Sequence, residues 1–128
     1  MDITGGKLCF FSAEFILKKL KNEIEEQLPD IFHSVSVRPV RMEAQYVGIN
    51  KGEALKIIAK MENISTSEII AFGDGENDIS MLKTVGVAVA VQNAMKRVKA
   101  AADDLCPSNQ KDGVADYLSK HILSKNKL

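Results

Sequence analysis

The sequence predicts an α/β fold with a parallel-sheet core in its second half and a smaller α/β unit before it. From residue 50 onward, apolar runs of strand length alternate with segments of helical periodicity, as in repeated strand and helix units. One run, GVAVAV at residues 86–91, is continuously apolar, which is typical of a parallel strand covered on both faces. We therefore divide the chain into residues 1–48 and residues 49–128.

The first unit is expected to contain three strands and one helix. KLCFF at residues 7–11 predicts a strand, and Ser12 is a suitable N-cap for a helix that runs to about Gln27. Strand-like runs at residues 32–37 and 41–47 predict two strands that could pair as a hairpin. The apolar stripe of the helix is expected to consist of Phe15, Ile16, Leu20, Ile24 and Leu28.

The second unit is expected to alternate helices and strands. Strands are predicted at residues 68–72, 86–91 and 104–106. Helices are predicted at about residues 50–61, 77–84, 94–101 and 113–123. The inward side of the first of these helices is expected to carry Ala54, Leu55, Ile58 and Ala59. Units of this length imply a parallel sheet with right-handed crossovers.

Composition limits the function classes. The chain has 128 residues, the size of one ordinary domain, and its 17 basic and 17 acidic residues cancel. A neutral chain has no global field to hold nucleic acid or an anionic membrane, so neither is expected as a partner. No apolar run approaches the roughly 18 residues that cross a bilayer, and we expect a cytoplasmic protein. Cys9 and Cys106 have no disulfide-like spacing and are interpreted as small core residues.

An acidic turn, GDGEND at residues 73–78, follows directly after a predicted buried strand. Ligands of open parallel sheets bind beyond the carboxyl ends of the strands, so this position favours a functional site. Gly73 and Gly75 would allow a sharp turn and close backbone approach. Asp74 and Asp78 would lie one helical turn apart and face a common point. Two such carboxylates repel unless a hard cation lies between them, and Mg²⁺ fits best.

These residues also allow other interpretations. Aspartates at a turn and a helix start are also ordinary capping residues. A calcium-binding EF-hand loop counted from Asp74 fails, because Ile79 stands where glycine is required and Val85 where glutamate is required. A dinucleotide-binding fingerprint fails for want of a third glycine. Lys51 stands at a predicted helix start, where it opposes the helix dipole; it is either an exposed lysine or is compensated by these carboxylates or a substrate phosphate.

Four stretches stand in a recognisable order: NKGEAL at residues 50–55, GDGENDISML at 73–82, GVAVAVQNA at 86–94 and SNQKDGV at 108–114. Together they resemble the haloacid dehalogenase-like phosphohydrolases, specifically the Cof-type sugar-phosphate phosphatases. The resemblance implies an incomplete Rossmann-like core of that family, preceded by the end of its α/β cap domain in residues 1–48.

The resemblance also implies a role for each motif residue. Lys51 would balance charge on the phosphate and the nucleophile, as a catalytic residue. Asp74 would bind Mg²⁺, and Asp78 would support the metal directly or through water. Substrate or phosphate binding is implied for Asn77, Gly75, Asn93 and Asn109. The implied activity is Mg²⁺-dependent hydrolysis of a small phosphorylated metabolite through an aspartyl-phosphate.

The nucleophile motif of that family, Asp-x-Asp, is missing from these 128 residues. The chain is therefore expected to be the C-terminal portion of such a phosphatase and to be inactive alone, because covalent transfer needs its nucleophile. A sheet without the first core strands would expose an unpaired edge, so we expect a dimer or a complementing N-terminal half. The alternative is a non-catalytic module that binds Mg²⁺ or phosphate, or pairs with another chain.

Overall fold

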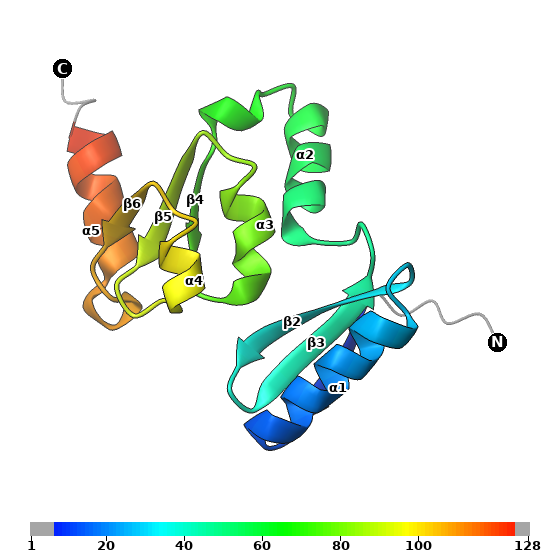
Figure 1. The fold of residues 1–128 in the computed structure, drawn as a ribbon. Helices are drawn as coiled ribbons and strands as arrows, with labels where there is room; N and C mark the ends of the chain where they lie inside the picture. The colour runs from blue at the N-terminus through cyan, green and yellow to red at the C-terminus, as the bar shows by residue number, and fades with distance from the viewer. Residues whose placement is uncertain (1–6, 125–128) are drawn as a thin grey trace.

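The fold consists of two three-stranded sheets, one antiparallel and one parallel, each with its own helices (Figure 1). The computed structural model describes residues 7–124. We call residues 7–46 the antiparallel unit and residues 51–124 the parallel unit. This mixed α/β architecture with a parallel sheet in the second half confirms the predicted fold class.

The antiparallel unit has the strand order β1-β3-β2, so the hairpin strands lie next to each other as predicted. Its first strand pairs with the last, with Lys7 opposite Gln45. Helix α1 packs against the sheet (Figure 1). The elements are β1 (Lys7–Phe11), α1 (Glu14–Gln27), β2 (Phe32–Arg38) and β3 (Arg41–Tyr46).

For α1 the expected N-cap was wrong and the expected apolar stripe was wrong in part. The N-cap is Ala13, which offers no side-chain hydrogen bond, and not Ser12. The helix buries Leu17, whereas Phe15 of the expected stripe is 73% exposed. Leu20 and Ile24 of that stripe are partly buried, whereas Ile16 and Leu28 are exposed like Phe15.

The parallel unit has the strand order β4-β5-β6, with all pairs parallel. Helix α3 lies between this sheet and α2, and α5 lies on the other side of the sheet (Figure 1). Its strands are β4 (Ile70–Gly73), β5 (Val87–Val91) and β6 (Asp104–Cys106). Its helices are α2 (Lys51–Met61), α3 (Ile79–Leu82), α4 (Lys96–Lys99) and α5 (Gly113–Leu118), with a wider π-type turn at Ser119–Leu123.

The helix predicted at residues 77–84 is shorter than expected because a 3₁₀ turn replaces its first residues. The acidic turn continues into a 3₁₀ turn, η2 (Glu76–Asp78), before α3 begins. Helix α2 turns Gly52 and Ala59 inward, while Ala54 and Ile58 of its expected inward side are exposed. The buried face of α2 is therefore rotated about the helix axis by part of a turn from the face that the sequence predicted.

The core of the parallel unit is built on β5, of whose five residues the last four, Ala88–Val91, are buried, as the continuous apolar run predicts. Cys106 is buried at the end of β6, but Cys9 is exposed on the edge strand β1, so its assignment to the core was wrong. Within residues 7–124, none of the helices combines the length and apolar character that crossing a membrane would require.

Candidate functional site

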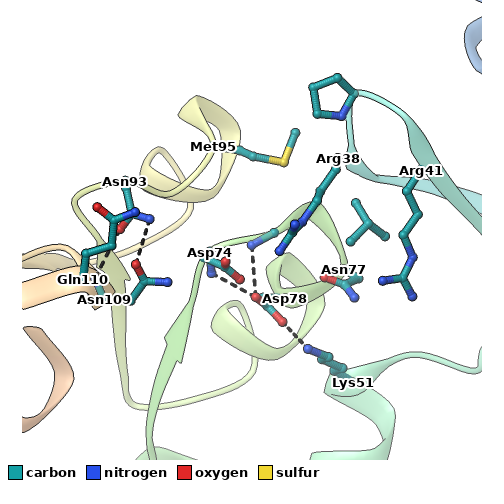
Figure 2. Close-up of a pocket in the computed structure, with 13 residues that line it drawn as sticks. Arg38, Arg41, Lys51, Asp74, Asn77, Asp78, Asn93, Met95, Asn109 and Gln110 are labelled. Atoms are coloured by element: carbon teal, nitrogen blue, oxygen red, sulfur yellow. Dashed lines mark hydrogen bonds and ion pairs between the residues drawn. The ribbon is translucent and has the colours of Figure 1, made fainter. Parts of the chain in front are cut away.

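The carboxyl ends of the three parallel strands meet at one edge of the sheet. Gly73 pairs with Ala90, and Val91 pairs with Cys106, so the loops after β4, β5 and β6 begin side by side. The turn between β2 and β3 faces these loops across a cavity of about 800 Å³ (Figure 2). All seven residues that the sequence singled out line this cavity: Lys51, Asp74, Gly75, Asn77, Asp78, Asn93 and Asn109.

The acidic turn is closed by the side chain of Asp78. Its Oδ2 accepts the backbone N–H groups of Asp74 at 2.9 Å and Gly75 at 3.1 Å. Gly73 makes room for this carboxylate, because a Cβ there would lie 2.8 Å from the Cβ of Asp78. Gly75 has an ordinary φ of −109°, so it is not required for a left-handed turn. Asp78 therefore does perform the capping chemistry that the sequence left open.

Lys51 is held against the acidic turn by the start of α2. Asn50 caps this helix by accepting the N–H of Glu53 at 3.0 Å, and the N–H of Gly52 donates to Ser80 Oγ at 3.2 Å. The ammonium of Lys51 then contacts Oδ1 of Asp78 (Figure 2). A carboxylate thus compensates the lysine at this helix start, one of the two possibilities that the sequence allowed.

The electrostatics keep Asp78 charged although its side chain is only 6% exposed. Burial alone would raise the pKa of the Asp78 carboxyl. The hydrogen bond from Lys51 and those from the N–H groups of Asp74 and Gly75 favour the ionised form more strongly, and the pKa lies below its ordinary value. Both oxygens of Asp78 therefore already have protein donors.

Asp74 is placed differently. Its backbone C=O accepts the N–H of Met95 at 3.0 Å, which ties the turn to the start of α4. Its carboxylate lines the cavity and, within residues 7–124, receives no hydrogen bond or ion pair from the protein. In the same range, no group of three His, Cys, Asp or Glu side chains could hold a metal ion. A cation at this site would take one free carboxylate from this turn and its other ligands from elsewhere.

Asn93 and Asn109 join the second and third loops. The side-chain amide of Asn93 donates to Oδ1 of Asn109 at 3.0 Å, and its Oδ1 accepts the N–H of Asn109 at 3.3 Å. The pair lines the side of the cavity opposite Lys51 (Figure 2). Asn77 also lines the cavity, but within the described part of the chain no hydrogen bond joins it to Lys51.

Sequence reasoning missed the residues that the hairpin brings to this cavity. Arg38 and Arg41 reach it from β2 and β3, and the guanidinium of Arg38 extends toward the acidic turn (Figure 2). Arg41 also pairs with Glu43 at 2.7 Å. The hairpin was predicted, but no local pattern relates its turn to residues more than thirty positions later.

Comparison with known proteins gives concordant matches. A family model described as haloacid dehalogenase-like hydrolase matches residues 2–118. The 5-amino-6-(5-phospho-D-ribitylamino)uracil phosphatase YbjI of Escherichia coli is 33% identical over 108 residues, which are 84% of this chain and 40% of that protein.

Two solved structures are similar to most of the chain. A protein of Streptococcus mutans superposes with a TM-score of 0.85 at 30% identity, over 92% of this chain and 45% of that one. The subclass IIB sugar phosphatase BT4131 superposes with a TM-score of 0.77 at 25% identity, over 88% of this chain and 42% of that one. The chain therefore spans about half or less of the length of these relatives.

Proposed function

Because this chain belongs to the haloacid dehalogenase-like hydrolase family, we propose that it forms the lysine- and metal-binding part of a phosphatase of the Cof type. Its proposed substrate is a small phosphorylated metabolite. Lys51, Asp74 and Asp78 converge on one cavity at the carboxyl edge of the parallel sheet, and this observation supports the proposal most directly. The cytoplasm is where we expect such a protein to act.

The donor set suits Mg²⁺. This ion typically takes one or two protein carboxylates and completes its shell with phosphate and water oxygens. Asp74 supplies a carboxylate that the described residues leave without a donor, at the mouth of the cavity. Asp78 supports Asp74 by binding its backbone N–H, and we propose that it acts on the metal through this contact or through water. When bound, Mg²⁺ would withdraw charge from a phosphoryl oxygen.

The remaining residues suit an anionic substrate. We propose that Lys51, which pairs with Asp78 and is 51% exposed, contacts a phosphate oxygen while Asp78 holds its ammonium in place. The amides of Asn77, Asn93 and Asn109 can donate to phosphate or hydroxyl oxygens at the rim, and the N–H of Gly75 is already used by Asp78. A phosphorylated metabolite with several hydroxyl groups fits such a polar lining.

Neither Asp103 nor Asp104, the adjacent acids at the start of β6, suits the role of the nucleophile. Asp103 accepts the N–H of Ala88 at 2.8 Å, and Asp104 accepts the hydroxyl of Tyr117 at 2.9 Å, so both have structural partners. The 128 residues contain no Asp-x-Asp. We therefore propose that these residues alone do not hydrolyse phosphomonoesters, and that a complementing N-terminal half supplies the nucleophile. A second copy of this chain would cover the open sheet edge but would bring no Asp-x-Asp.

The metal proposal is tested by titrating Mg²⁺ into the chain while the amide signals of residues 73–75 are followed by NMR. We expect the wild type to show saturable shifts there and Asp74→Asn to weaken binding at least about tenfold, because it removes the free carboxylate. Asp30→Asn, an exposed carboxylate in the turn after α1, is the matched control. Shifts that survive Asp74→Asn unchanged would place the ion elsewhere.

The alternative function is a non-catalytic module, and a complementation assay distinguishes it from a part of an enzyme. A segment carrying Asp-x-Asp, added to the chain with Mg²⁺ and a generic phosphomonoester, should restore turnover if the chain is part of an enzyme. Asp74→Ala should then abolish that turnover. A chain that binds Mg²⁺ but gives no turnover with any such segment would favour the module.

A further inference from the structure

Glu76 is the third acid of the turn, and it points away from the cavity that Asp74 and Asp78 line. It is absent from that cavity's lining and instead lines two neighbouring hollows of about 500 and 340 Å³. Its side chain is only 10% exposed. A carboxylate buried to this degree needs partners, and the described residues supply three of them.

The three partners come from three different elements. Oε2 of Glu76 accepts the backbone N–H of Ser36 in β2 at 2.7 Å and lies 3.9 Å from Nζ of Lys21 in α1. Oε1 is paired with the guanidinium of Arg97 in α4. One side chain therefore joins the antiparallel unit, through β2 and α1, to the parallel unit, through η2 and α4.

The contact with Ser36 has a clear physical cause. Strand β2 is an edge of the sheet β1-β3-β2, and an edge strand has N–H groups without a strand partner. Such a group needs an acceptor when it is partly buried, and a carboxylate is a stronger acceptor than a neutral oxygen. Ser36 stands two residues before Arg38, which lines the cavity from the hairpin turn.

We propose that Glu76 is a positioning residue that fixes the β2–β3 hairpin over the acidic turn, so that Arg38 faces the cavity. The turn then has two faces. Asp74 and Asp78 serve the cavity, and Glu76 holds the hairpin that covers it. The consequence for a bound substrate rests on the proposed function, but the position of the hairpin does not.

The test measures the distance between two labelled turns that face each other across the cavity. Spin labels are placed at Val40→Cys in the hairpin turn and Lys111→Cys in the loop after β6, with exposed Cys9 changed to Ser and buried Cys106 left in place. We expect one narrow distance distribution in this background, and a broader or longer one when Glu76→Ala is added. Glu53→Gln, in an exposed pair with Lys56, should leave the distribution unchanged.

Amide exchange at Ser36 gives an independent readout. Loss of a charge-assisted hydrogen bond should speed exchange there by about 10- to 100-fold in Glu76→Ala. Glu76→Gln keeps an oxygen acceptor but loses the attraction of Lys21 and Arg97, so we expect a smaller acceleration and a partial broadening. If Glu76→Ala does not fold, the distance distribution and the Ser36 exchange rate of Glu76→Gln test the proposal by themselves.

The proposal is overturned if the folded variants keep both the wild-type distance distribution and the wild-type exchange rate at Ser36. Mg²⁺ binding at Asp74 should survive in Glu76→Ala, since Glu76 lies outside the lining of that cavity. Failure of the proposed function would instead remove Mg²⁺ binding from the wild type as well, so the two failures are distinguishable.

Discussion

Asp78 organises the site although both of its carboxylate oxygens are already occupied by protein donors. Oδ2 accepts two backbone N–H groups of its own turn, and Oδ1 accepts the ammonium of Lys51 from a different helix. These contacts are strongest with the ionised carboxylate, because a protonated carboxyl would give up part of its acceptor capacity. The geometry of the acidic turn is thus linked to the charge of a single residue.

This link predicts a pH-dependent stability. The pKa of Asp78 is lower in the folded protein than in the unfolded chain, so its contribution is complete above about pH 4 and is lost as the pH falls through the folded-state value. We expect Asp78→Asn to lower the free energy of unfolding by about 2 kcal/mol at pH 7. Denaturant unfolding should show this difference shrinking below about pH 4.

Asp116→Asn provides the control for that comparison. Asp116 is paired with Lys120 at 2.8 Å on the surface of α5, and exposed pairs contribute little. Its unfolding free energy should stay within about 0.5 kcal/mol of the wild type. A difference between Asp78→Asn and the wild type that stays constant down to pH 2 would contradict the role of the charge.

Among the elements, the contact between α2 and α3 sets the position of Lys51. A Cβ on Gly52 would lie 2.5 Å from the backbone oxygen of Ser80, so the two helices approach more closely than any larger residue allows. Gly52→Ala must therefore move one helix, and we expect a loss of about 1 to 3 kcal/mol in unfolding free energy. Gly75→Ala is a matched control, because its Cβ would meet only the mobile end of Asn77, at 2.9 Å.

The loss of stability in Gly52→Ala is measured by thermal or denaturant unfolding, with Gly75→Ala measured beside it. The same variant should also weaken the ion pair between Lys51 and Asp78, since residue 51 precedes the displaced position. A Gly52→Ala variant as stable as the wild type would mean that α2 and α3 can separate at no cost. That result would contradict the tight packing at this contact.

The elements also show what could be predicted from the sequence. The buried run of β5 and the acidic turn were predicted because strand periodicity and turn residues are local signals. Six of the seven motif residues line one cavity because parallel strands carry their loops to the same edge, and the start of α2 adds Lys51. The inward faces of α1 and α2 were predicted less well, since they depend on the element that each helix packs against, the antiparallel sheet for α1 and helix α3 for α2.

On the scale of the whole molecule, the contacts between residues far apart in the chain could not be predicted from the sequence. The partners of Glu76 lie in β2, α1 and α4, and nothing in the local pattern assigns them. Cys9 is exposed because β1 lies at the edge of its sheet. Whether a strand takes an edge or a central position is determined only when the sheet assembles. These are the features in which tertiary packing overrides the local signal.

The parallel sheet has an open edge at β4, which within residues 7–124 pairs only with β5. Helix α2 presents an apolar surface in the same unit, with Ile57 61%, Ile58 53% and Met61 77% exposed. An open strand edge and exposed apolar side chains both favour association. We expect the chain to self-associate at micromolar concentration in sedimentation velocity experiments, unless a segment that supplies the adjoining strand is added.

Substitutions on α2 test this association directly. Ile58→Lys combined with Met61→Lys places two charges on the apolar surface, and we expect the sedimentation profile to shift toward the monomer with the helix content unchanged. Phe15→Lys, on the exposed side of α1, is the control for adding charge at an exposed apolar position and should leave association intact. A wild-type chain that stays monomeric up to millimolar concentration would show that the β4 edge and α2 need no partner.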